Sequence, residues 1–135
     1  MSAGPTLAIG VGCRKGCAAE AVAALVRRVL ALHAGAAEGT AALFTIVDKQ
    51  AEPGIAAAAV ALGLPLVYLP RAALEEAAPA ALTRSERVVA LFGVPSVAET
   101  AALAGAGPGS RLLAPRVSQD GATCAIAVSQ RGEPS

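Results

Sequence analysis

The chain has 135 residues, about the length of one domain, and 55% of them are hydrophobic although only 2% are aromatic. A net charge of +1, without a basic stripe interleaved with aromatic residues, argues against nucleic acid as the main partner. Three cysteines fit a reducing compartment better than a disulfide framework, and MSAGPT lacks the pattern of a secretory signal, so we expect a cytoplasmic protein. The longest uncharged run, 53–70, is interrupted by Gly63 and Pro65 and predicts a helix, a turn and a strand, so no membrane span is expected.

Candidate strands and helices alternate along the first half of the chain. Short apolar runs closed by glycine, proline or polar residues predict buried strands at 6–11, 41–47 and 66–69. Large apolar residues at helical spacing predict an amphipathic helix over 18–32. An alanine-rich helix is predicted over 54–62, ending at Gly63, and a short helix is predicted from Pro70 through Glu76.

Two further helices are predicted in the second half. Residues 85–92 are ambiguous by pattern alone, and a helix is preferred because Thr83 or Ser85 can cap it. Ser96, followed three residues later by Glu99, forms the sequence pattern of a capping box. This pattern predicts a helix that continues through ETAALA to the glycines that follow.

The end of the chain carries the signal of a β-hairpin. Apolar runs at 111–117 and 122–129 predict two strands, and the Asp-Gly pair at 120–121 between them favours a tight turn. Strands alternating with helices, followed by this hairpin, predict an α/β three-layer sandwich. Its mostly parallel sheet of about five strands would end in a C-terminal antiparallel hairpin. We expect one domain over 1–135, with 130–135 as a flexible tail.

The stretch GVGCRKGC, residues 10–17, follows the first predicted strand and so lies at the carboxyl edge of a parallel sheet, where α/β proteins bind ligands. Its glycines let the backbone approach a ligand and expose N–H groups, and its two cations add charge. With the N-terminus of the following helix, these features predict an anion-binding site. The alternative is a tight strand-to-helix turn with solvated cations. The candidate binding residues are Gly10, Gly12, Cys13, Arg14, Lys15 and Gly16.

The sequence limits which anion this turn would bind. The dinucleotide pattern G-x-G-x-x-G fails because Lys15 occupies the third glycine position, and the P-loop pattern is absent. A nucleotide is therefore unsupported, although a phosphate- or nucleotide-binding regulatory domain stays an alternative. Carboxylates suit the same donors equally well, and Arg14 can hold one with two parallel hydrogen bonds.

The cysteines point to no metal or cofactor. Cys13 and Cys17 have C-x₃-C spacing, whereas thioredoxin-type redox motifs use C-x-x-C. Cys124 and His33 are not spaced as a second zinc half-site. Two interpretations of the pair remain: a thiolate whose pKa is lowered by the helix N-terminus and Arg14, or small residues packed in a turn, of which the second is favoured.

Few residues suggest acid–base chemistry. Asp48 is the best candidate for a catalytic base, because it ends the second predicted strand at the ligand-binding edge beside Lys49; it would equally well cap the next helix. The single histidine makes a Ser-His-Asp arrangement unconvincing. Ser96 and Glu99 are most simply the cap of their own helix, whose N-terminus could present N–H groups to the same cleft.

Four segments together resemble the CobE/CbiG C-terminal domain family of cobalamin biosynthesis: GVGCRKG, VDKQAEPG, GVPSVAETAALAGA and RVSQDGATCAIAV. They cover nearly the whole chain in the family's order. In that family the domain forms the C-terminal part of cobalt-precorrin-5A hydrolase, which opens a lactone and releases acetaldehyde, or it stands alone in the aerobic pathway. The present chain resembles the free-standing form. The family's D-x-K segment is matched by Asp48-Lys49 without the intervening residue.

The resemblance implies a protein that binds polycarboxylate precorrin or corrinoid intermediates as an accessory or carrier, and that could meet other enzymes of the pathway. Gly12, Arg14, Lys15 and Gly16 would hold the carboxylates, and Ser96 with its neighbours would close the site. The alternative is a precorrin hydrolase. There, Asp48 would activate water while Arg14 or Lys15 stabilises the oxyanion.

Overall fold

The computed structural model describes residues 7–33 and 41–129. Position 6 of the first predicted strand and the predicted tail at 130–135 lie outside this part of the chain. The elements in chain order are β1 (Leu7–Cys13), α1 (Ala19–Leu32), β2 (Ala41–Ile46), η2 (Val47–Lys49), α2 (Pro53–Leu62), β3 (Leu66–Leu69), α3 (Arg71–Ala77), η3 (Ala78–Ala80), α4 (Glu86–Phe92), α5 (Val97–Ala106), β4 (Arg111–Leu112), β5 (Val117–Gln119) and β6 (Ala122–Val128), where η denotes a short 3₁₀ helix.

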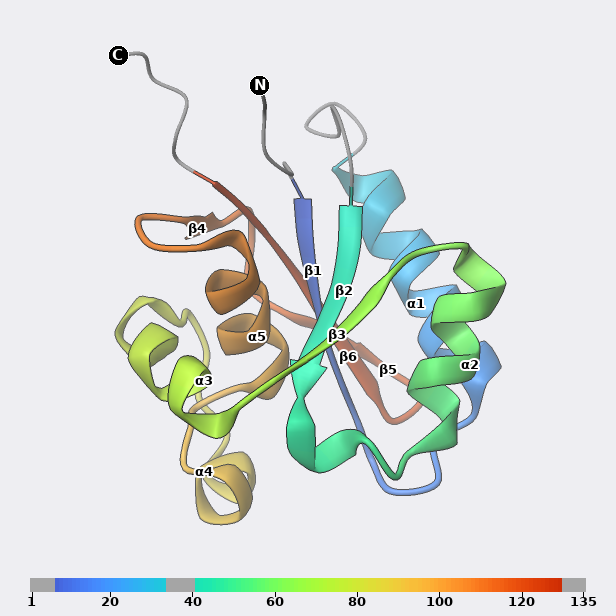
Figure 1. The fold of residues 1–135 in the computed structure, drawn as a ribbon, viewed down its shortest axis with the longest axis horizontal. Coiled ribbons are helices and arrows are strands. Elements are labelled where there is room, and N and C mark those ends of the chain that lie inside the picture. The colour runs from blue at the N-terminus through green and yellow to red at the C-terminus, as the bar shows by residue number, and fades with distance from the viewer. Residues whose placement is uncertain (1–6, 34–40, 130–135) are drawn as a thin grey trace.

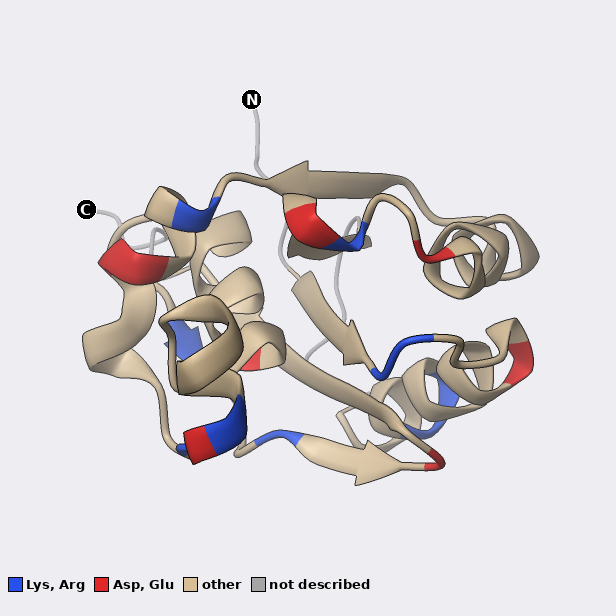
Figure 2. Ribbon diagram, turned by 90° about the horizontal axis from the view of Figure 1, so that it is seen from below, with Lys and Arg blue, Asp and Glu red and all other residues tan. Residues whose placement is uncertain are grey.

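Six described strands form one mixed sheet in the order β3-β2-β1-β6-β4, and β5 also pairs with β6. β1, β2 and β3 are parallel, whereas β6 runs antiparallel to β1, β4 and β5. Helices α1 and α2 cover one face of the sheet, and α3 and α5 lie on the other (Figure 1). The view from below looks onto the edge where β1 and β2 end (Figure 2). The predicted three-layer α/β sandwich is confirmed.

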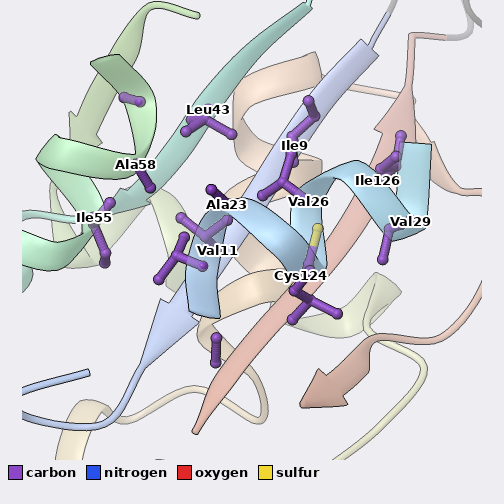
Figure 3. Close-up of a cluster of buried hydrophobic side chains, with 14 of the residues drawn as sticks. Ile9, Val11, Ala23, Val26, Val29, Leu43, Ile55, Ala58, Cys124 and Ile126 are labelled. Atoms are coloured by element: carbon purple, nitrogen blue, oxygen red, sulfur yellow. The ribbon is translucent and has the colours of Figure 1, made fainter. Parts of the chain in front are cut away.

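The two faces of β1 are built from side chains of different size. Successive strand residues point to opposite faces, and Leu7, Ile9 and Val11 pack with α1 and α2 in the main core. Figure 3 shows this cluster, in which side chains of β1 and β6 meet those of the two helices. The opposite face of β1 carries Ala8 and Gly10, and β6 adds more alanine there. This thin face lets α5 approach the sheet closely.

Gly10 marks the point of closest approach between β1 and α5. A Cβ atom at this position would lie 1.9 Å from the Ala98 carbonyl oxygen and 2.6 Å from the Ala102 nitrogen. Glycine is therefore required here by helix–strand packing. The prediction that Gly10 helps to hold a ligand does not match this placement, because its open side is filled by the helix.

The hairpin at the end of the chain has the turn that Asp-Gly predicts. Asp120 (φ 53°) and Gly121 (φ 85°) both adopt positive φ, as a type I′ turn requires. The strand predicted over 111–117 is wrong in its extent, because β4 and β5 are separate. Pro115 lies between them and has no N–H to donate to a sheet ladder.

The two helices predicted in the second half both begin at a capping serine, and of the two candidates for the ambiguous segment 85–92 the cap is Ser85. The Ser85 Oγ accepts a hydrogen bond from the Val88 N–H (3.3 Å), and the Ser96 Oγ accepts one from the Glu99 N–H (3.1 Å). Within the described residues no single helix is long and apolar enough to cross a membrane; α4 and α5 pass by length and composition only as a pair bent by 63°.

A Gly10→Ala substitution tests the close approach. We expect it to lower the free energy of unfolding by at least about 3 kcal/mol, since the added methyl group meets backbone atoms that cannot move independently. Gly63→Ala is the control: Gly63 has φ 69° and no neighbour within 4 Å of an added Cβ, so the expected loss is only about 1 kcal/mol. Urea unfolding measures both, and equal losses would contradict the packing argument.

Candidate functional site

A cavity of about 590 Å³ opens at the carboxyl edge of the sheet, on the side covered by α5. Its walls come from five parts of the chain: the end of β1 with the following loop, η2, α4, the N-terminus of α5 and the β5–β6 hairpin. These segments meet at the edge seen in Figure 2. The predicted location of the site, after the first strand at the carboxyl edge, therefore coincides with a cavity.

Positive charge without carboxylate partners gathers around this cavity. Within the described residues, each Arg–carboxylate ion pair lies outside it: Arg27 with Glu20, Arg71 with Asp48, and Arg84 with Glu86. One carboxylate, that of Asp120, belongs to a lining residue. The basic lining residues are Arg14, Lys15, Lys49, Arg87 and Arg116. Five cations around a single carboxylate make the cavity strongly attractive to anions.

Arg14 belongs to one unit with the β5–β6 turn. Its N–H donates a hydrogen bond to the Gly121 carbonyl oxygen (2.9 Å). Its aliphatic stem lies along the turn, so that a Cβ on Gly121 would be 3.6 Å from the Arg14 Cδ. The first and last motifs of the sequence therefore form one wall of the cavity together.

Lys49 joins three elements at the cavity: η2, the end of β1 and α4. Its Nζ donates a hydrogen bond to the Cys13 carbonyl oxygen (2.7 Å) and lies 5.3 Å from the centre of the Phe92 ring. The ring of an aromatic residue attracts a cation over its face. Lys49 is thus fixed by the end of β1 and by α4, with its charge directed to the cavity wall rather than to an acidic partner.

One wall of the cavity is apolar. α4 contributes Val88, Leu91 and Phe92, and α5 contributes Val97. Leu91 lines the cavity and is 55% exposed, and no residue of α4 is buried. This wall is therefore open to a ligand. An apolar wall in the same cavity as five cations suits a ligand that is both hydrophobic and anionic.

Gly12 lies on the cavity floor, inside β1 rather than in a turn. The predicted strand end at position 11 is too early: β6 pairs with Gly12 and Cys13 and extends the strand by two residues. A Cβ on Gly12 would lie 2.8 Å from the Thr123 Oγ1 and 3.6 Å from the Val97 Cβ. The missing side chain therefore keeps the floor open between these two residues.

The structure brings together Gly12, Cys13, Arg14, Lys15, Lys49 and Ser96 among the predicted site residues. It does not place four others on the cavity. Gly10 packs under α5, and the Gly16 N–H donates to the Glu52 Oε1 (2.9 Å). Asp48 is bound to the Arg71 Nη2 through its Oδ2 (2.9 Å), and the Glu99 carboxylate accepts backbone hydrogen bonds inside the fold.

Two helix N-termini line the cavity: that of α5, which the sequence also suggested for this cleft, and that of α4, through its capping Ser85. The start of α1, predicted to contribute as well, does not line it, because the loop after β1 carries the chain to the other face of the sheet. Pattern analysis also missed Arg87, Arg116 and Asp120 as cavity residues. They occur in segments identified only as a helix and a hairpin, and no local motif marks them.

The thiol of Cys13 is less acidic than usual. Burial raises its pKa to about 11, although the positive charge of Lys49 acts in the opposite direction. Burial also raises the pKa of Cys17 and that of Cys124, the latter to about 12. A thiolate activated by Arg14 and a helix N-terminus is therefore wrong for this loop, and packing of small residues is the better account.

Alkylation of Cys13 with iodoacetamide at pH 8 measures this directly. A pKa raised from 9.0 to about 11 leaves about 100-fold less thiolate at that pH, so the native protein should react correspondingly slowly. The urea-unfolded chain is the control and should react at the ordinary rate, with mass mapping to assign each site. Rapid native labelling of Cys13 would contradict the raised pKa.

Comparisons with known proteins agree over nearly the whole chain. Residues 7–127 match the family model described as Cobalamin synthesis G C-terminus. The chain is 40% identical to Protein CobE of Sinorhizobium sp over 126 residues, which cover 93% of this chain and 81% of that protein. The crystal structure of CobE, a protein from the cobalamin (vitamin B12) biosynthetic pathway, matches with a TM-score of 0.82 and 39% identity, covering 91% of this chain and 89% of that one.

A second solved structure, cobalamin biosynthesis protein chiG from Agrobacterium tumefaciens str. C58, matches with a TM-score of 0.69 and 37% identity over 92% of this chain and 98% of that one. The chain belongs to the cobalamin synthesis G C-terminal family, and the resemblance inferred from its motifs is confirmed. Within that family it is a cobalamin biosynthesis protein similar to CobE in sequence and in fold.

Proposed function

We propose that this protein binds a polycarboxylate precorrin or corrinoid intermediate in the cavity, as an accessory or carrier for other enzymes of the pathway. The observation that supports this most directly is the set of five cations around one carboxylate. Such intermediates combine an apolar macrocycle with several acetate and propionate groups. Each half of that chemistry has a counterpart in the cavity, since the cations suit the carboxylates and the α4 wall suits the ring.

Arg14, Arg87 and Arg116 are the residues proposed to hold carboxylates through paired hydrogen bonds, which the planar guanidinium group favours. Lys15 and Lys49 supply compact charge beside them. The five cations lie on four separate segments, which matches a ligand whose anionic groups point outward in several directions. A cavity of about 590 Å³ lies within the usual size range of small-molecule sites.

The position of Asp48 supports a binding role over hydrolysis through this residue. Its carboxylate is bound to Arg71 and does not line the cavity. A general base must come within hydrogen-bond reach of the water that it activates. The phosphate-binding alternative explains the cations but gives no role to the exposed Leu91 beside them.

Titration with hydrogenobyrinic acid at low salt, followed by absorbance, tests the proposal. We expect Arg87→Gln and Arg116→Gln each to weaken binding roughly tenfold, because each removes one charge-assisted contact. Arg27→Gln removes the same charge from α1, away from the cavity, and should leave the affinity unchanged. No spectral change with the unaltered protein, even with ligand in large excess, would remove the proposed function.

The same titration should depend on the charge of the ligand. We expect affinity to fall as salt rises, because carboxylates at an open cavity are screened. Cobyrinic acid and cobinamide both hold cobalt, and in cobinamide the peripheral carboxylates are replaced by amides, so cobinamide should bind much more weakly than cobyrinic acid. Equal affinity for both corrinoids would show that the cations do not select the ligand.

Gly12→Ala tests the cavity floor. The added methyl group meets the Thr123 hydroxyl at 2.8 Å and narrows the floor, so we expect affinity for hydrogenobyrinic acid to fall at least about fivefold. Gly63→Ala lies away from the cavity and serves as the binding control. Unchanged affinity in Gly12→Ala would mean that the ligand does not reach the floor beside β1.

A further inference from the structure

Glu99 is fully buried, and its carboxylate makes an unusual set of contacts. Its Oε1 accepts hydrogen bonds from the backbone N–H groups of Leu82 and Thr83, both at 2.9 Å. Its Oε2 accepts one from the Arg116 N–H at 2.9 Å. No Lys or Arg side chain in the described residues forms an ion pair with it. Three peptide donors alone hold this buried carboxylate, and hydrogen bonds of this kind are among the stronger ones in proteins.

These contacts differ from those of a capping box. In a capping box the glutamate side chain would turn back to the N–H of the capping serine. Ser96 does cap α5 through its Oγ, but the Glu99 side chain reaches two other segments instead. The Ser96/Glu99 pattern therefore has two roles in the structure: Ser96 caps α5, and Glu99 holds the backbone of two other segments.

The two segments held by Glu99 lead directly into two parts of the cavity wall. Leu82 and Thr83 precede α4, which carries Arg87. Arg116 itself lines the cavity and precedes the β5–β6 hairpin. α4 has no buried residue and packs against the core only through the partly buried Val88 and Phe92, and the Glu99 hydrogen bonds fix the backbone that leads into it. One carboxylate on α5 thus links the backbone positions from which two cavity cations extend.

We propose that Glu99 is a positioning residue, which sets the relative positions of Arg87 and Arg116 at the cavity by holding the backbone at 82–83 and at 116. This role rests on the proposed function, since its consequence is measured in ligand binding. A glutamine at this position keeps the size of the side chain but presents one accepting oxygen instead of two. At least one of the two segments would then lose its hydrogen bond to the side chain at position 99.

A double-mutant cycle measured with hydrogenobyrinic acid tests this role. Arg116→Gln should weaken binding roughly tenfold in the unaltered protein but less than twofold in a Glu99→Gln background, because the side chain is already misplaced there. Lys15→Gln is the matched control: the loop after β1 is not held by Glu99, so its effect should be the same in both backgrounds. Thr100→Val removes the buried hydrogen bond to the Ser96 carbonyl oxygen and should leave the Arg116 effect intact.

Native-state hydrogen exchange gives a readout independent of ligand. The N–H groups of Leu82, Thr83 and Arg116 should lose protection in Glu99→Gln and keep it in Thr100→Val. Where Glu99→Gln does not fold, Glu99→Asp replaces it, since the shorter side chain cannot reach all three donors. For Glu99→Asp we expect the same loss of coupling and of protection.

The outcomes are distinct. Full additivity of Arg116→Gln and Glu99→Gln, with binding intact, would overturn the positioning role alone. Loss of the Lys15 effect together with the Arg116 effect would also overturn it, since general disorder would then be the cause. No binding by the unaltered protein would remove the proposed function, and the positioning role with it.

Discussion

Helix α5 lies against a face of β1 and β6 that carries almost no side-chain volume, and the position of the cavity follows from that approach. Because Gly10 offers only hydrogen to the helix, the Ala98 carbonyl group can lie where a methyl group would otherwise be. The close approach brings Ser96, Val97 and Glu99 to the carboxyl edge of the sheet. A larger residue at position 10 would lift the helix and open the part of the cavity wall that Ser96 and Val97 form.

The distribution of charge separates stability from function in this molecule. The ion pairs of the described residues lie away from the cavity, where they are partly exposed and contribute little to stability. The five cations at the cavity repel one another, and Asp120 is the one carboxylate among the described lining residues that offsets this. Clusters of like charge that lower stability are expected at functional sites. A polyanionic ligand would relieve the repulsion between these cations.

Buried polar contacts are placed where the cavity walls meet the rest of the fold. Glu99 ties α5 to the segments before α4 and β5, Lys49 ties η2 to the end of β1, and Thr45 donates to the Val11 carbonyl oxygen inside the sheet. Each such bond is worth more where water is excluded. Together they give irregular segments the fixed geometry that packing of small apolar side chains alone would not provide.

The sequence by itself determined the alternating elements, the Asp-Gly turn, the serine caps and the basic loop at the end of β1, because each of these depends on residues within a few positions of one another. It also determined the family, through four motifs in order. Only the tertiary structure decided that Gly10 packs under a helix, that Asp48 is bound to Arg71, and that Arg87 and Arg116 line one cavity with Arg14. Those facts depend on contacts between segments separated by up to about a hundred residues, and no local spacing encodes which of them meet.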